Sequence, residues 1–407
     1  MMPFTPTKPL RFGEFVALMA LMSAMVAFSI DAMLPALPVI GVELSPGMPT
    51  RGQLVIPAFM LGLGLGILVC GPVSDAYGRK SVLLVGLVLY IGGALLASKA
   101  ATIEGLLGAR VLQGLGAAAP RVVATAMVRD LYQGRAMARV TSIIMTLFVL
   151  FPAVAPSIGA GIILLADWRA IFYAFVVLGL VSGVWLMLRQ PESLPPARRR
   201  ELSLRAIGSA IAEITTHRAV MVYVFALIFS FAPLFTWLSN LPVIFDDVYD
   251  RAASFPLWFA ATALIAGSAS MVNAQLVMRM GMRKLATFAF SWQVAVSALF
   301  VVLLQIDLPD PWNFGLFFAF MCSTFFTIGL TFGNLNALAL QPLGHIAGIG
   351  ASVVMSISTI GAVAVSVPVA LAYNGTPLTL VAGNLGFAGC ALGLLLYSRR
   401  FAAADMA

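Results

Sequence analysis

Charged residues are scarce in this sequence. Asp, Glu, Lys and Arg make up 10% of its 407 residues, whereas hydrophobic residues make up 61%. Soluble domains are about one quarter charged, and a core in this chain could not remove so much apolar surface from water. The composition therefore excludes a water-soluble globular protein and predicts a polytopic membrane protein that is solvated largely by the lipid bilayer.

Cysteine and histidine are scarce as well. The three cysteines, Cys70, Cys322 and Cys390, each lie within an apolar run, and the two histidines, His217 and His345, have no ligand spacing. We therefore expect neither a disulfide framework nor a metal site. The sequence also offers no nucleophile–base set, which disfavours a membrane enzyme.

Long apolar runs are what the sequence does contain. A helix needs about 20 apolar residues to cross the hydrocarbon core of a membrane. The first run is long enough to span, so we expect an uncleaved first helix and not a removed signal peptide. Twelve segments meet the length requirement: 12–36, 52–73, 81–99, 103–127, 139–164, 169–189, 219–242, 254–278, 284–305, 312–337, 346–372 and 376–398.

The basic residues indicate how these spans are oriented. With twelve spans both termini lie on one side; eighteen of the 24 Lys and Arg residues fall on that side, four on the other, and two within 103–127. Cytoplasmic loops carry the excess of Lys and Arg, so we predict cytoplasmic termini. The excess of Lys and Arg on the cytoplasmic face, where it sets the orientation of the spans and contacts anionic lipids, then explains the net charge of +8. The charge therefore does not require a nucleic-acid partner.

Two short segments suggest an internal repeat. "DAYGRKSVLL" (75–84) and "MRMGMRKLAT" (278–287) both place a glycine before basic residues on the cytoplasmic side, half the chain apart. This pattern predicts two parallel bundles with a central site between them: an N-terminal six-helix bundle at 1–189, a linker at 190–218 and a C-terminal six-helix bundle at 219–407.

The linker at 190–218 is a loop by composition. It contains "PESLPPARRRELSLR", which is rich in proline and arginine. We expect a surface helix over 202–216 within it.

Five motifs carry a family resemblance. "GPVSDAYGRK" (71–80) is similar to the loop 2–3 signature of a transporter superfamily, "RVLQGLGAA" (110–118) to its helix 4 signature, and "AVAPSIGAG" (153–161) to its helix 5 antiporter signature, with Ala155 at the place of the first glycine. "DAMLPALP" (31–38) resembles the end of helix 1, and "LNALALQPLGHIAGIGAS" (335–352) the segment before helix 11, in one subgroup of drug exporters.

These motifs identify the sequence as resembling the major facilitator superfamily, and within it the drug:proton antiporters of the Bcr/CflA (bicyclomycin resistance/chloramphenicol efflux) group. The resemblance covers the whole chain. It implies an all-α integral membrane protein with twelve transmembrane helices in two pseudo-symmetric six-helix bundles, the major facilitator fold.

Asp31 is an ionisable residue inside a predicted membrane span, where a charge is costly. It follows an uncharged run that begins at Phe15, and a carboxylate near mid-helix costs about 2.5–3.5 kcal/mol on insertion scales. Low-dielectric surroundings favour its neutral form, so it can hold a proton and release it when water or a cation approaches. The resemblance implies the same role in proton exchange. The alternative is a structural Asp that caps the helix end before Pro35.

Arg110 is a candidate counter-charge for Asp31. Counted from the outer ends of their helices, the two residues differ in depth by about 3 Å. An ion pair that forms when Asp31 is ionised would link proton occupancy to helix geometry, and we assign both residues to proton coupling. The equal alternative is a scaffold role, in which Arg110 holds backbone carbonyls of helices 1 and 2.

Arg121 lies outside the family signatures. Eleven positions separate it from Arg110, which places both on one helix face together with Gly114 and Ala117. The face between the two arginines therefore carries only small residues. It is either a tight helix contact or the wall of a water-filled cavity, and the charges at its two ends favour the cavity wall. Two arginines against one carboxylate favour neutral, anionic or zwitterionic substrates. The alternative for Arg121 is snorkelling to the cytoplasmic surface.

Two groups of residues are assigned to conformational change. The resemblance implies a latch made of Gly71, Asp75, Gly78, Arg79, Lys80, Arg129 and Asp130. In it Asp75 sits against the N-terminus of helix 11, and Arg79 completes a charge network near Arg129 and Asp130. The alternative is an ordinary positive-inside loop, which explains the basic residues but not Asp75 between two glycines. In the helix 5 antiporter motif, Pro152, Pro156 and Gly159 form a bendable segment with a small-residue face. It fits close packing against the opposite half, with plain helix packing as an equal alternative.

The second half carries no charged residue at membrane depth. Its candidates are amides and aromatic residues: Trp237, Asn240, Asn273, Trp292, Gln293, Asn334 and Asn336. Trp237 and, from the first half, Phe28 have flat faces that stack on drug rings. The residues assigned to substrate binding are Asp31, Phe28, Arg121, Gln113, Trp237, Asn240 and Asn334.

Together these features predict a proton-coupled antiporter that exports small amphipathic drugs or toxic compounds across the bacterial inner membrane by alternating access. We expect a functional monomer, a small-molecule substrate, protons as the coupling ion and no other cofactor. An exporter of a polar metabolite, such as a sugar or an amino-acid-like compound, is the alternative on the same scaffold. A sensor is disfavoured because the linker is too short to be a signalling domain.

Overall fold

The computed structural model describes residues 10–306 and 308–404, and within them it contains helices and no strand. Eleven continuous helical stretches in this part of the chain are long and apolar enough to cross a membrane. One of them, Trp312–Leu371, has 60 residues and contains two helices, α12 (Trp312–Leu340) and α13 (Ala347–Leu371), each long enough to span. The predicted all-α membrane fold with twelve transmembrane helices is therefore confirmed.

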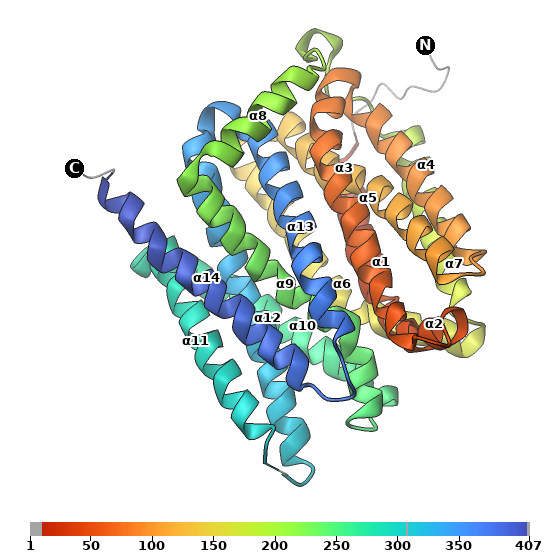
Figure 1. Ribbon diagram of the computed structural model, residues 1–407. Helices are drawn as coiled ribbons and strands as arrows, with labels where there is room; N and C mark the ends of the chain where they lie inside the picture. The colour runs from red at the N-terminus through yellow and green to blue at the C-terminus, as the bar shows by residue number, and fades with distance from the viewer. Residues whose placement is uncertain (1–9, 307, 405–407) are drawn as a thin grey trace. The chain divides into compact units, whose positions relative to one another are not determined.

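The chain divides into two compact units, Met1–Gly208 and Ser209–Ala407, so the division falls inside the 190–218 segment. Unit 1 contains α1 (Phe12–Asp31), η1 (Leu34–Ala36), α2 (Leu37–Leu44), η2 (Pro49–Leu54), α3 (Val55–Tyr77), α4 (Arg79–Ser98), α5 (Ile103–Leu131), α6 (Gly134–Leu165), α7 (Arg169–Arg189) and η3 (Pro196–Arg198) (Figure 1). Unit 2 contains α9 (Arg218–Asp247), η4 (Ala252–Ser254), α10 (Phe255–Met280), α11 (Met282–Leu303), α12, η5 (Gln341–Ile346), α13 and α14 (Leu378–Ala404). The remaining helix, α8 (Leu204–Thr216), contains the division and corresponds to the surface helix expected over 202–216.

The first span is not a single helix. α1 ends at Asp31, and the chain continues through η1, which contains Pro35, into α2, which has Pro38 in its first turn. Proline lacks the N–H that would continue the hydrogen-bond ladder of the preceding helix. Asp31 is therefore at the end of a helix and not near its middle, although it remains inside the apolar stretch Phe12–Leu44.

The internal repeat is visible in the backbone. Gly78 is the single residue between α3 and α4, with φ 99° and ψ 151°, and Gly281 is the single residue between α10 and α11, with φ 78° and ψ 154°. Positive φ is accessible to glycine at little cost. The same residue type thus makes the same one-residue turn in both units, at equivalent places in the two repeated sequences.

In unit 1, α5 packs closely against α3 and α4 through glycines. A Cβ on Gly114 would lie 1.9 Å from the Phe59 carbonyl oxygen of α3, and one on Gly116 would lie 2.3 Å from the Tyr90 nitrogen of α4. Ala117 is fully buried. The strip between Arg110 and Arg121 is thus a tight helix contact, and the prediction of a water-filled cavity wall is wrong at Gly114.

Candidate functional site

The candidate site in unit 1 is built around Asp31. Its side chain is buried, with the residue only 6% exposed. Among the described residues its carboxylate has neither a hydrogen-bond nor an ion-pair partner. A buried carboxylate is costly in its charged form unless it is paired. This environment favours the protonated form until water or a cation reaches the group.

The helix 5 antiporter motif packs beside Asp31. A Cβ on Gly159 of α6 would lie 2.0 Å from the carbonyl oxygen of Ala32, the residue after Asp31. Pro152 and Pro156 lie inside α6, and Pro156 is buried. Gly159 therefore packs against α1 within its own unit, as in the plain helix-packing alternative.

Arg110 does not pair with Asp31 in this conformation. Its guanidinium donates to the Ser29 carbonyl oxygen at 2.9 Å, to the Val55 carbonyl oxygen at 3.3 Å and to Gln113 Oε1 at 2.7 Å. It also lies over the Phe59 ring, 4.5 Å from the centroid. Fully buried, Arg110 ties α1 to α3, so the structure has the scaffold arrangement that was the alternative to an ion pair.

Two polar residues that sequence reasoning missed complete this arrangement. Tyr90 of α4 and Ser29 of α1 share a hydrogen bond of 2.6 Å, and Ser29 also donates to the Met25 carbonyl oxygen at 2.7 Å. Tyr90 is therefore the donor to Ser29. The turn that carries Asp31 is thus fixed two residues earlier by both α4 and α5. A lone tyrosine in the apolar 81–99 run was the only signal for this role.

The other predicted substrate residues of unit 1 lie in packed surroundings. Phe28 is 8% exposed and makes an edge contact with Phe175 of α7, with the centroids 5.5 Å apart. Gln113 is fully buried, and its Nε2 has no hydrogen-bond partner among the described residues. Arg121 is half-buried and directly follows Pro120, which lies inside α5. Phe28 is therefore buried in unit 1, with Phe175 as an aromatic neighbour.

In unit 2 the predicted residues Trp237 and Asn240 lie on α9. Both are fully buried, and Trp237 packs against Phe317 and Phe320, with centroids 6.1 and 5.6 Å away. Asn240 donates to the Thr236 carbonyl oxygen at 2.8 Å. Four buried polar atoms on this stretch lack a partner among the described residues: Thr236 Oγ1, Trp237 Nε1, Ser239 Oγ and Asn240 Oδ1. Buried polar groups are normally paired, so this stretch of α9 has unused capacity to bind a polar group.

Asn334, by contrast, is satisfied within unit 2. Its Nδ2 donates to Asn273 Oδ1 at 2.6 Å and to the Leu330 carbonyl oxygen at 2.8 Å. It therefore joins α12 to α10, and its amide N–H groups are used inside the protein.

The residues of the latch motif form a charge network in unit 1. Arg79, 7% exposed, donates to Asp130 Oδ2 at 2.9 Å and to Asp75 and Ser74. Gly71 and Asp75 lie inside α3, and Arg129 is exposed and takes no part in the network. Asp75 thus pairs with Arg79 from the last turn of α3, and the expected charge network joins Arg79 to Asp130. The position of Asp75 against the N-terminus of helix 11, which belongs to unit 2, stays a prediction.

A residue of the linker occupies the N-terminus of α4. Glu192 accepts from the backbone N–H of Arg79 at 2.9 Å and from that of Lys80 at 3.1 Å, the first two residues of α4. The Lys80 ammonium donates to the Met187 carbonyl oxygen at 2.8 Å. A carboxylate is favoured at a helix N-terminus because it faces unpaired N–H groups and the positive end of the helix dipole.

The sequence matches the Major Facilitator Superfamily over residues 19–366. The chain belongs to this superfamily. Its fold is also that of a solved superfamily transporter, the xylose transporter XylE from E. coli in a partially occluded inward-open conformation, with a TM-score of 0.72 at 11% identity over 96% of this chain and 97% of that one. A second similar structure is that of the human organic anion transporter MFSD10, with a TM-score of 0.66 at 15% identity over 96% of this chain and 99% of that one.

Bacterial members of the superfamily are similar along most of the chain. A protein named as an uncharacterized MFS-type transporter, YdgK, from Bacillus subtilis is 29% identical over 334 residues, covering 81% of this chain and 82% of its own. A bicyclomycin resistance protein homolog from Haemophilus influenzae is 27% identical over 344 residues, covering 84% and 85%. Multidrug resistance protein MdtL from Salmonella typhi is 28% identical over 324 residues, covering 79% of each chain. The superfamily comprises transporters, so the chain is a multi-pass membrane transporter and not an enzyme.

Proposed function

We propose that this transporter is a proton-coupled antiporter that exports small amphipathic drugs or toxic compounds. The observation that carries the proposal is Asp31, a carboxylate at the end of α1 that is 6% exposed and has no partner in the part of the chain that the structure describes. The names of the Haemophilus and Salmonella relatives support drug export as the physiological role.

The chemistry of the cycle follows from the environment of Asp31. Protonated, the residue is neutral and tolerates burial; ionised, it requires water or a positively charged or hydrogen-bond-donating ligand. We infer that substrate and proton occupy the site alternately, so that substrate arrival releases the proton. Because Arg110 is committed to Ser29, Val55 and Gln113, it positions the Asp31 turn and does not itself bind the proton. No cofactor other than the proton is required.

The setting of this cycle is part of the proposal. We place the protein in the bacterial inner membrane as a functional monomer, with both termini in the cytoplasm, because Lys and Arg concentrate on that side of the predicted spans. Alternating access would come from movement of one unit against the other.

A second candidate function is export of a polar metabolite on the same scaffold. The unused polar atoms of Thr236, Trp237, Ser239 and Asn240 favour it. A sugar or an amino-acid-like compound offers enough hydroxyl, amino or carboxylate groups to satisfy them, whereas a largely apolar drug does not.

The proton-coupling proposal is tested by proton release. The wild-type protein and Asp31→Asn are reconstituted in proteoliposomes with a pH-sensitive dye, and chloramphenicol, a neutral aromatic probe, is added. We expect wild type to release protons on binding, and Asp31→Asn to bind without release, since Asn has the same shape but no titrating proton.

Asp246→Asn is the matched control, because Asp246 is an exposed carboxylate at the end of α9. Uphill export that continues unchanged in Asp31→Asn would refute the coupling role. Binding and proton release by a sugar or amino acid, with none for aromatic compounds, would select the metabolite exporter.

A further inference from the structure

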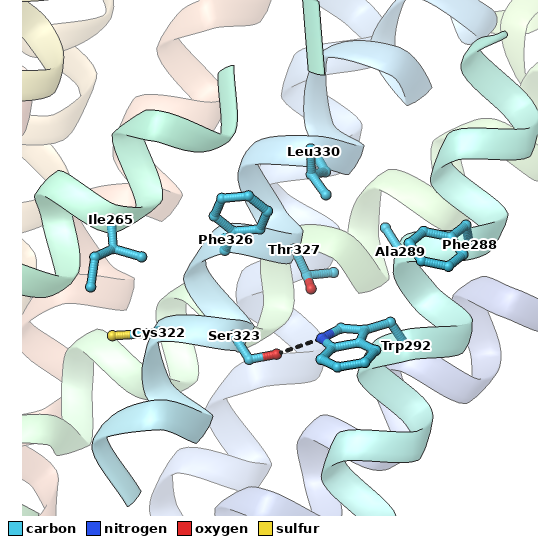
Figure 2. A pocket seen from close by; sticks show the side chains of 9 residues that line it. All are labelled: Ile265, Phe288, Ala289, Trp292, Cys322, Ser323, Phe326, Thr327 and Leu330. Carbon is cyan, nitrogen blue, oxygen red and sulfur yellow. Dashed lines mark hydrogen bonds between the residues drawn. The ribbon is translucent and has the colours of Figure 1, made fainter. Parts of the chain in front are cut away.

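A groove of about 430 Å³ opens on an exposed apolar face of unit 2. Figure 2 shows Ile265 of α10, Phe288 and Trp292 of α11, and Phe326 of α12 around it. Ile265, Phe288 and Trp292 are 41%, 56% and 55% exposed. All three helices are long and apolar enough to cross a membrane, where exposed side chains on an outer face would meet lipid tails. The volume lies in the range of small-molecule pockets, about 300–1,000 Å³.

The polar atoms of the groove are organised around the buried side chain of Gln293. The Trp292 indole N–H donates to the Ser323 hydroxyl at 3.1 Å, as Figure 2 shows. Ser323 and Thr327 both donate to Gln293 Oε1, each at 3.1 Å. Gln293 is held in turn by its donation to Thr324 Oγ1 at 2.9 Å.

This network leaves the groove with hydrogen-bond acceptors only. The hydrogens of Trp292, Ser323 and Thr327 are all used, whereas each hydroxyl oxygen keeps a lone pair. The Cys322 thiol also lines the groove, and its hydrogen is used as well, because it lies 3.8 Å from Thr262 Oγ1, which donates its own hydrogen to the Trp258 carbonyl oxygen. A ligand in the groove therefore finds acceptors and no donors. A molecule that carries a hydroxyl or an N–H group would complete the hydrogen bonding, whereas an ether or a hydrocarbon would not.

Trp292 also lies at an unusual depth. It is ten residues from the start of α11 and eleven from its end, which places it about 15 Å from either end of the helix. Tryptophan is enriched at the membrane–water interfaces and not at the bilayer centre. An exposed tryptophan at mid-depth, hydrogen-bonded inside the protein, is therefore not an interfacial anchor and offers its ring face to the groove.

We propose that this groove binds a flat lipophilic molecule with one hydrogen-bond donor, of the phenol type, that is dissolved in the bilayer. The ring lies against Trp292 and Phe288, and the donor reaches the hydroxyl oxygen of Thr327, since that of Ser323 already accepts from Trp292. Aromatic pairs of this kind prefer offset or edge arrangements. An acyl chain has no donor and no ring, so the lining favours the phenol. The site lies wholly within unit 2 and is independent of proton coupling at Asp31.

The proposal is tested with the full chain in lipid nanodiscs and two probes of nearly equal shape, 4-bromophenol and 4-bromoanisole. Bromine quenches tryptophan fluorescence on contact, and the difference between wild type and Trp292→Phe isolates the Trp292 signal. At equal mole fractions in the membrane, we expect saturable quenching by 4-bromophenol. Quenching by 4-bromoanisole, which lacks the donor, should rise linearly.

Thr327→Val keeps the side-chain shape and removes the acceptor. It should raise the half-saturating concentration of 4-bromophenol about fivefold, the effect of one lost hydrogen bond. Thr287→Val is the matched control: Thr287 lies on the same helix as Trp292, donates to the Arg283 carbonyl oxygen and does not line the groove. It should leave binding unchanged.

Two results would overturn the proposal. Equal, linear quenching by both probes would mean that they only partition into lipid. Quenching of Trp292 by a dibrominated phosphatidylcholine that 4-bromophenol fails to relieve would mean that an acyl chain occupies the groove. Both results need only wild type and Trp292→Phe, so they do not depend on the folding of Thr327→Val.

Discussion

Two buried ionisable side chains in unit 1, Arg110 and Asp31, differ in whether their polar atoms have hydrogen-bond partners. Arg110 is fully buried, and its guanidinium binds two backbone carbonyls and one side-chain amide. Asp31 is almost as buried but has no partner among the described residues. A paired charge is stable where it is, whereas an unpaired one is relieved by taking up a proton. Of the two, Asp31 is therefore the residue able to change its charge during transport.

Arg110→Lys is expected to destabilise the protein. An ammonium group on a flexible stem cannot reach three acceptors in fixed directions as a guanidinium does. At least one buried carbonyl would lose its partner, at a cost of about 1–3 kcal/mol in the free energy of unfolding. Thermal unfolding in detergent measures the loss, with the exposed Arg129→Lys as the control. A variant of wild-type stability that fails in proton release would instead assign Arg110 to proton coupling.

At the scale of the helices, close backbone contact through glycine determines which elements pack together. Gly114 and Gly116 bring α5 against α3 and α4, and Gly159 brings α6 against the end of α1. Helices in a membrane gain no hydrophobic driving force from one another, so close van der Waals packing takes on that role. The contact at Gly159 also determines the surroundings of Asp31, because it lies on the next residue, Ala32.

Gly159→Ala should separate α6 from α1. The new Cβ would lie 2.0 Å from the Ala32 carbonyl oxygen, and the contact is with backbone, which cannot turn away as a side chain can. We expect a loss of about 1–3 kcal/mol in unfolding free energy, typical of overpacking, together with reduced substrate-driven proton release.

Gly161→Ala is the matched control for this prediction. Gly161 lies two residues further along α6, and a Cβ there would meet nothing within 4 Å. Alanine is favoured over glycine in a helix by about 1 kcal/mol, so this variant should be as stable as wild type or more so. Equal stability of the two variants would contradict the role given to Gly159.

For the molecule as a whole, the first part of the linker belongs physically to unit 1. Glu192 caps α4, Ser193 donates to Asp130 at 3.2 Å, and the backbone N–H of Arg200 donates to the Asp75 carbonyl oxygen at 3.0 Å. Unit 1 accordingly extends to Gly208, beyond the bundle of 1–189 expected from the spans alone. Any movement of the linker would therefore act on the turn between α3 and α4.

Glu192→Ala should release this part of the linker. We expect trypsin to cleave at Arg198–Arg200 several-fold faster than in wild type, because cleavage requires a local opening that the cap opposes. Thr216→Ala is the control, a change in the same linker at an exposed side chain that donates to carbonyl oxygens of its own helix and lies away from the cleavage sites. An unchanged cleavage rate in Glu192→Ala would show that the cap does not hold the linker.

The membrane fold could be predicted from the sequence because its main determinants are local. A run of about 20 apolar residues must become a helix in lipid, since its backbone polar groups have no other partners. The segment 169–189 coincides with α7, and the glycines of the two repeated sequences become identical one-residue turns. Asp31 was also identifiable locally, as an acid in an otherwise uncharged stretch.

The partners of these residues were decided only by the tertiary structure. Depth along two helices placed Arg110 level with Asp31, but the guanidinium donates to the backbone carbonyls of Ser29 and Val55 instead. Every residue has a backbone carbonyl, so no sequence pattern could identify these two as the partners. Likewise, the carboxylate that caps α4 comes from Glu192, more than a hundred positions away along the chain. Helix formation depends on each segment's own residues, whereas hydrogen-bond direction and close packing depend on which distant backbone lies opposite.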